Sequence, residues 1–155
     1  MKKLLTAIAA LTSLSINAGE NQSLNQFMVK NYDWKQDSSH IVHVGTRCAT
    51  VMDAAVWRLS ADNRSDVKSL ADQYKSIGDV YLFSTAPIAQ KINYSTDSYT
   101  KLYKNWMDTY KLMAEENAIK YNDFFHGMLG DDFMICGDKK NFSFYKSMLK
   151  NSARK

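Results

Sequence analysis

Apolar side chains recur every three or four residues along most of this chain, which is the period of an α-helix. One such stripe predicts a helix over residues 38–59, and a second predicts a helix that ends before Pro87. No segment alternates apolar and polar residues for long enough to predict a strand. The pattern therefore predicts an all-α fold. The first stripe consists of Ile41, Val44, Cys48, Met52, Ala55 and Leu59, and the second of Val67, Leu70, Tyr74, Ile77 and Tyr81.

Polar and helix-breaking residues set the expected ends of these helices. Ser23 and Gln26 stand three residues apart, as in a capping box, and predict a short helix within residues 19–37 that packs loosely. Pro87 should end the third helix, because the residue before a proline is biased away from the helical conformation. A short additional turn can follow the proline.

The longest apolar stripe predicts a helix from about Asp97 to Met128, some 45 Å long. Glycines and aspartates then end it, and Phe133–Cys136 follows as an apolar, non-helical segment. A last helix is expected from about Asn141, with residues 151–155 frayed. Helices joined by short turns pack antiparallel. We therefore expect a small antiparallel bundle of four to five helices, in which the second, third and fourth form the centre.

The first eighteen residues have the organisation of a secretory signal peptide. Lys2 and Lys3 precede an apolar stretch from Leu4 to Ile16, and a cleavage point is expected near Ala18. The stretch is too short for a membrane-spanning helix, which needs about 20 residues, and no later segment is long enough either. The prediction is a chain exported to the periplasm or beyond the cell, without a stable membrane span after cleavage, and with one domain over residues 19–155.

Charge argues against a nucleic-acid partner. The formal net charge is +4, and subtracting the two signal-peptide lysines leaves +2. Lysines and Arg154 gather in the last seventeen residues, but a solvated chain end explains them better than a binding surface does. We expect a protein partner outside the cytoplasm and no nucleic acid.

Cys48 and Cys136 are the only cysteines. In an oxidising compartment, they should form one disulfide. A loop of 88 residues closed in this way is stabilised by roughly 4–5 kcal/mol in the chain-entropy description. The alternative is two separate thiols. The sequence has no Cys-x-x-Cys pair, so disulfide-exchange chemistry is not indicated.

Four aromatic residues on the long fourth helix form the most unusual candidate site. Their polar tips need hydrogen-bond partners when they are buried. They predict either a ligand groove or an amphipathic edge of the core, and we favour the edge. The residues are Tyr99, Tyr103, Trp106 and Tyr110.

Metal and cofactor sites are poorly supported. His40 and His43 are three residues apart and could share a helical face, and His126 is the remaining histidine, but nothing in the spacing supplies a matched third ligand. Asp131, Asp132 and Asp138 lack the calcium-loop pattern and suit a turn and helix caps better. Methionines are scattered as core residues. We expect neither a metal nor a cofactor.

No motif for a catalytic nucleophile or a phosphate-binding loop is present. The first hypothesis is therefore an exported helical protein that binds a partner and has no catalytic activity. The second is a periplasmic carrier of a small molecule, a metal or haem that uses the helical core. An enzyme remains a third hypothesis, because catalytic groups often meet only in the folded chain.

Overall fold

A computed structural model describes residues 22–152, and the predicted signal peptide lies outside them. The all-α class and the disulfide are confirmed for this part of the chain. The described residues form six α-helices, more than the four to five predicted, together with one 3₁₀ turn. These elements are α1 (Leu24–Lys30), η2 (Trp34–Gln36), α2 (Ser38–Leu59), α3 (Ser65–Lys91), α4 (Thr96–Tyr121), α5 (Gly127–Gly137) and α6 (Lys139–Ser152).

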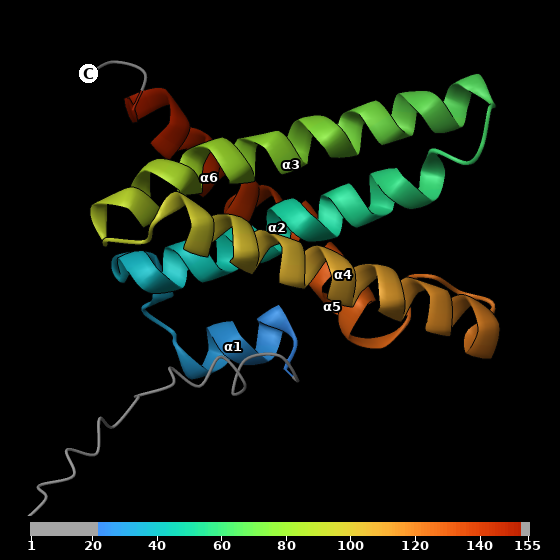
Figure 1. The fold of residues 1–155 in the computed structure, drawn as a ribbon, viewed down its shortest axis with the longest axis horizontal. Coiled ribbons are helices and arrows are strands. Elements are labelled where there is room, and N and C mark those ends of the chain that lie inside the picture. Colours follow the sequence, from blue (N-terminus) through green and yellow to red (C-terminus); the bar gives the residue numbers. More distant parts are fainter. Residues whose placement is uncertain (1–21, 153–155) are drawn as a thin grey trace, which may run out of the picture.

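Helix α2 is the centre of the bundle (Figure 1). Helix α3 returns antiparallel along it, α4 crosses it on another side, and α5 packs against its middle. Helix α6 packs on α3, and α1 contacts α5. Neighbours on several sides explain why the polar residues Thr46, Arg47 and Thr50 are buried along with the predicted apolar stripe. The second, third and fourth helices were expected to form the centre together, whereas α3 and α4 both pack on α2 and hardly touch each other.

The capping box predicted at the start of α1 is confirmed. The Ser23 hydroxyl accepts a hydrogen bond from the Gln26 amide at 3.4 Å, and the Gln26 side chain accepts one from the Ser23 amide at 3.1 Å. Leu24 and Trp34, in the segment expected to pack loosely, are buried in the core. These contacts fix the path of the chain into α2.

The prediction that the third helix ends before Pro87 is wrong, because α3 continues to Lys91. Proline removes one amide donor, and the carbonyl that loses its partner is four residues back, on Phe83. Phe83 lies on an exposed side of the helix, where water can replace the missing amide. Ala89 beyond the proline is buried, so packing holds the last turn in the helical conformation.

The long fourth helix is also shorter than predicted, because α4 ends at Tyr121 rather than Met128. Asn122 has a positive φ of 52°, a conformation that asparagine tolerates better than most residues. The Asn117 amide group donates hydrogen bonds to the carbonyls of Phe124 and His126, at 3.1 and 2.8 Å. The loop therefore turns sharply although apolar residues keep helical spacing across it.

The segment predicted as a non-helical anchor is the second half of α5. Its Cys136 forms the disulfide with Cys48 of α2, with a Cα–Cα distance of 5.2 Å and both side chains fully buried. The Tyr81 hydroxyl of α3 donates a hydrogen bond to the Cys136 carbonyl at 2.8 Å. Three helices thus meet at the bridge. Within residues 22–152, no helix has the length and apolar character that crossing a membrane requires.

Candidate functional sites: a buried polar cluster and an open cavity

A charged cluster lies inside the bundle, where the sequence predicted only apolar packing. Arg47 of α2 and Asp132 of α5 form an ion pair, and both side chains are fully buried. The Tyr110 hydroxyl of α4 donates a hydrogen bond to Asp132 and accepts one from Arg47 Nε at 3.1 Å. Burial raises the pKa of the Asp132 carboxyl, and Arg47 acts against that shift. Burial also raises the pKa of Tyr110, so its hydroxyl stays protonated.

The same cluster fastens the segment before α1. Arg47 donates a third hydrogen bond to the carbonyl of Gln22 at 2.9 Å. The backbone amide of Leu24 donates to the other oxygen of Asp132. Asp132 was expected to serve in a turn and is instead the buried acceptor that joins four parts of the chain. Asp138 does act as a cap, since it accepts hydrogen bonds from the amides of Lys140 and Asn141.

Aromatic rings and a histidine cover the Arg47 side of the cluster. The guanidinium lies 4.0 Å from the centre of the Trp106 ring, and His43 meets the same ring edge-on at 6.0 Å. Phe27 of α1 covers His43 at 4.4 Å. Burial, with smaller contributions from Arg47 and His40, lowers the pKa of His43 to about 3. His43 is therefore neutral at physiological pH.

The groups of this cluster contact only one another and the rest of the chain, so the cluster is suited to stabilising the fold and not to catalysis. Arg47, Asp132 and Tyr110 have no exposed surface, and Trp106 is only 5 % exposed. A dissolved substrate cannot reach these groups while α1 is in place. We assign the cluster a structural role, in holding α1, α2, α4 and α5 together.

The four aromatic residues predicted as a ligand groove or a core edge all make internal contacts. Tyr99 shares a hydrogen bond of 2.7 Å with Thr85 of α3, and Tyr103 donates one to Asp53 of α2. Burial first, and then Asp53, raises the pKa of Tyr103. Trp106 and Tyr110 belong to the cluster around Arg47. None of the four lines the open cavity at the ends of α2 and α4.

The three histidines weighed as metal ligands have different surroundings. His40 and His43 both contact the Phe27 ring. His126, in the loop after α4, stacks on the ring of Tyr121 at 3.8 Å. Across residues 22–152, no group of three or more histidine, cysteine, aspartate or glutamate side chains is placed to hold a metal ion. Asp131, beside the buried Asp132, is exposed.

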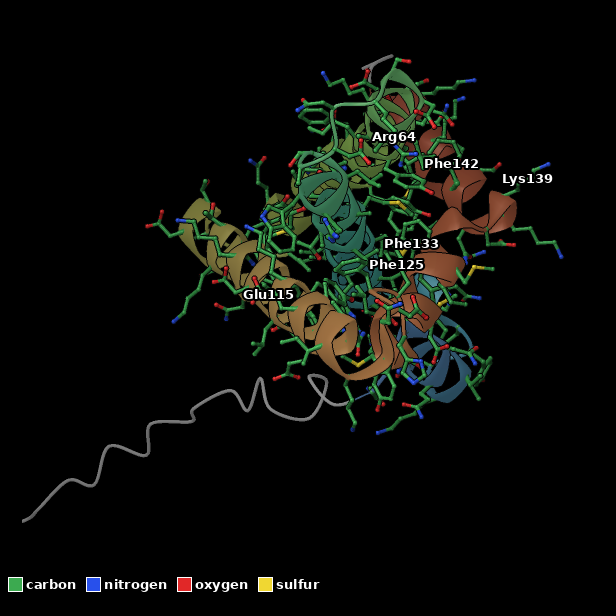
Figure 2. The ribbon with its side chains drawn as sticks, turned by 90° about the vertical axis from the view of Figure 1, so that its right-hand side faces the viewer. Arg64, Glu115, Phe125, Phe133, Lys139 and Phe142 are labelled. Carbon is green, nitrogen blue, oxygen red and sulfur yellow. A yellow bond between two sulfur atoms is a disulfide. The ribbon has the colours of Figure 1, made fainter. Side chains whose placement is uncertain are left out.

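An open cavity of about 520 Å³ lies where the end of α2 meets the end of α4 and the loop after it. Figure 2 looks onto this end of the molecule, with Glu115 on α4 and Arg64 after the turn that leaves α2. Apolar groups make up most of the lining, and Arg58 and Glu115 supply its charges. The lining residues are Trp57, Arg58, Ser60, Ala61, Glu115, Ala118, Ile119 and Phe124.

Arg58 is the lining residue of this cavity that has a buried polar atom without a partner. Its guanidinium carbon lies 3.8 Å from the centre of the Phe124 ring, a stacked cation–π arrangement. Its Nε is buried, and no described residue accepts a hydrogen bond from it. The nearby carboxylate of Asp62 is instead paired with Arg64 at 2.9 Å. Arg58 therefore lines the cavity without an ion-pair partner among the described residues.

Apolar side chains on α4 extend the cavity onto the surface. Ile119 is 88 % exposed and Leu112 is 57 % exposed. They stand seven residues apart, with Glu115 between them, so they lie on one face of the helix. The sequence placed Trp57, Arg58 and Ile119 in no site, because each lies outside the core stripes. A clue was available in Leu112 and Ile119, since two large aliphatic residues on the polar side of an amphipathic helix are unusual.

Comparison with known proteins gives no further guidance on these sites. No family model, no curated protein and no solved structure matches the chain.

Proposed function

We propose that this protein is an exported, non-catalytic binding protein that holds a partner protein at the cavity between α2 and α4. The observation that carries the proposal is the 88 % exposed Ile119 at the rim of a cavity with aromatic walls. Contiguous exposed apolar surface rimmed by polar groups is typical of interaction sites. Buried aromatic and arginine side chains supply much of the binding energy in protein interfaces, and Trp57, Phe124 and Arg58 are of these types.

Export is inferred from the signal-like residues 1–18 and agrees with the disulfide. The absence of catalytic activity is inferred from the two sites themselves. The titratable groups of the buried cluster, Arg47, Tyr110 and Asp132, are closed to solvent. The open cavity holds Arg58 and Glu115 without a nucleophile paired to a base. Both features suit binding better than chemistry.

Photo-crosslinking in the native host tests the proposal. A photoreactive amino acid at Ile119 reports on the cavity, and the same group at the exposed Lys68 of α3 is the control position. A second substitution, Ala61→Trp, fills the cavity from an exposed lining position, whereas Asn63→Trp adds the same bulk outside it. Both should leave the fold intact, which circular dichroism checks.

The expected result is a discrete adduct with a protein partner from position 119 and none from position 68. Ala61→Trp should abolish that adduct, and Asn63→Trp should leave it unchanged. Adducts that form equally from both positions, or that persist with the cavity filled, would refute the proposal.

A small-molecule carrier is the second candidate, because a volume of about 520 Å³ falls within the range of ligand pockets. Mass spectrometry of the native protein distinguishes it from the first. A carrier would release a bound compound of defined mass on denaturation, and Ala61→Trp would prevent its capture. A metal or haem ligand would in addition appear in elemental analysis or in the visible spectrum.

A further inference from the structure

We infer that the cavity binds a protein segment in which an aromatic or large aliphatic side chain stands beside a carboxylate, and that Arg58 binds the carboxylate. This inference rests on the proposed function and adds the chemistry of the partner. It follows from the state of Arg58, the shape of the cavity lining and the position of Glu115.

Arg58 requires an acceptor that the described part of the chain does not supply. Its Nε is buried without a hydrogen bond, and Arg58 is in none of the ion pairs among the described residues. A carboxylate from an occupant would supply the charge partner that the described residues do not give Arg58. The Phe124 ring covers one face of the guanidinium, so a ligand in the cavity would have to approach the terminal N–H groups at its edge. A carboxylate fits such an edge, because its two oxygens match the spacing of the guanidinium N–H groups.

The rest of the lining selects an apolar side chain next to that carboxylate. Trp57, Phe124, Ala118 and Ile119 line the same cavity as Arg58 and give it ring and aliphatic surface. An isolated carboxylate would leave this surface in water, and an isolated apolar side chain would leave Arg58 without an acceptor. A peptide carrying both groups within one or two residues satisfies both parts of the cavity.

Glu115 sets the direction of the occupant. It belongs to α4, whereas Arg58 belongs to α2, and it is exposed. A second carboxylate would be repelled by Glu115 and attracted by Arg58, so the acidic end of the segment should lie against α2. Removing the charge of Arg58 should therefore weaken binding, and removing the charge of Glu115 should strengthen it. Loss of folding would weaken binding in both variants.

Selection from a random heptapeptide library displayed on phage tests the inference, with the disulfide-bonded protein immobilised through its C-terminus. Wild-type protein should enrich peptides with Asp or Glu within two positions of Phe, Tyr, Trp, Leu or Ile. The enriched peptide is then made with Asp or Glu replaced by Asn or Gln, and both forms are titrated by fluorescence anisotropy. The acidic form should bind about ten- to a hundredfold more tightly, the range expected for a hydrogen-bonded charge pair.

Three variants complete the test. Arg58→Gln should remove most of the difference in affinity between the two peptides. Glu115→Gln should increase the affinity for the acidic peptide by about twofold or more. Lys104→Gln, an exposed change elsewhere on α4, removes one positive charge as Arg58→Gln does and should leave the difference intact.

Enrichment of basic or uncharged peptides, or of the same peptides on Arg58→Gln, would overturn the inference, and so would no enrichment at all. The proposed function would still stand if crosslinking at position 119 remained sensitive to Ala61→Trp. A dimer in sedimentation that Ile119→Asp dissociates would identify a second copy as the occupant and would also overturn the inference.

Discussion

Replacing Asp132 by asparagine should destabilise the protein more than any other change of one carboxylate to an amide in residues 22–152. Asp132 accepts hydrogen bonds from Arg47, Tyr110 and the Leu24 amide, and it has no exposed surface. Asparagine keeps the size of the side chain but removes its charge and turns one acceptor into a donor. Arg47 then remains buried as an uncompensated cation.

The expected cost follows from this geometry. Removing one partner of a buried ion pair costs about 3–5 kcal/mol. Domains of this size are stable by about 5–15 kcal/mol in total, so the loss is a large fraction of the whole. The melting temperature should fall by roughly 10–20 °C. Chemical denaturation followed by circular dichroism, with the disulfide intact, measures the free energy of unfolding directly.

The neighbouring Asp131→Asn is a matched control, because it makes the same chemical change at an exposed position of the same helix turn. It should shift the free energy of unfolding by less than about 0.5 kcal/mol. The double variant Arg47→Met, Asp132→Leu should recover part of the loss, since an apolar pair needs no charge compensation. Recovery should be incomplete because the Gln22 carbonyl and the Leu24 amide lose their partners. An Asp132→Asn protein within 1 kcal/mol of its control would refute this account of the cluster.

Three further predictions concern the packing around α2. Replacing Cys48 and Cys136 together by alanine should lower the free energy of unfolding by up to about 5 kcal/mol, and peptide mapping of the untreated protein should show no free thiol. Gly45→Ala should cost about 1–3 kcal/mol, because its Cβ would lie 2.1 Å from Thr85 Cγ2 and 2.7 Å from the Tyr145 ring, whereas Gly137→Ala, with open space around it, should be nearly neutral in the same denaturation assay. Burial lowers the pKa of His43 to about 3 in the fold, so as the pH falls the unfolded chain binds a proton before the folded chain does. The free energy of unfolding should therefore drop by about 1.4 kcal/mol between pH 7.5 and 5.5. His43→Gln should flatten that pH dependence, and an unchanged slope would show that His43 is not the group responsible.

The sequence predicted the helices well where one apolar stripe faces one neighbour. In α2 the stripe from Ile41 to Ala55 is buried as expected, and it carries Cys48 to its disulfide partner. The prediction failed where local signals competed with packing. Pro87 predicted the end of a helix, but packing of the following turn keeps α3 helical to Lys91. Apolar residues keep helical spacing across Asn122, although the chain turns sharply there and Asn117 stabilises the turn.

The charged cluster was missed for a different reason. Arg47 and Asp132 are 85 residues apart, and nothing local links an arginine on an apolar helix to an acid in a glycine-rich segment. The available clue was positional. Leu129, Asp132 and Cys136 share helical spacing, so Asp132 stands on the same buried face as a disulfide cysteine. A charge on a buried face requires a partner of opposite sign on another helix, which periodicity alone does not identify.

Arg47 and Arg58 are two arginines of α2 that both stack on an aromatic ring, but only Arg47 has a carboxylate partner among the described residues. Eleven residues make about three turns, so the two arginines point to nearly the same side of α2. Each stacks on an aromatic ring, Trp106 for Arg47 and Phe124 for Arg58. Arg47 has a buried carboxylate from its own chain, whereas Arg58 has none among the described residues and lies at an open cavity. The internal pair shows which ligand this stacked arginine geometry accepts, and it gives an independent reason to expect an acidic group from the partner at Arg58.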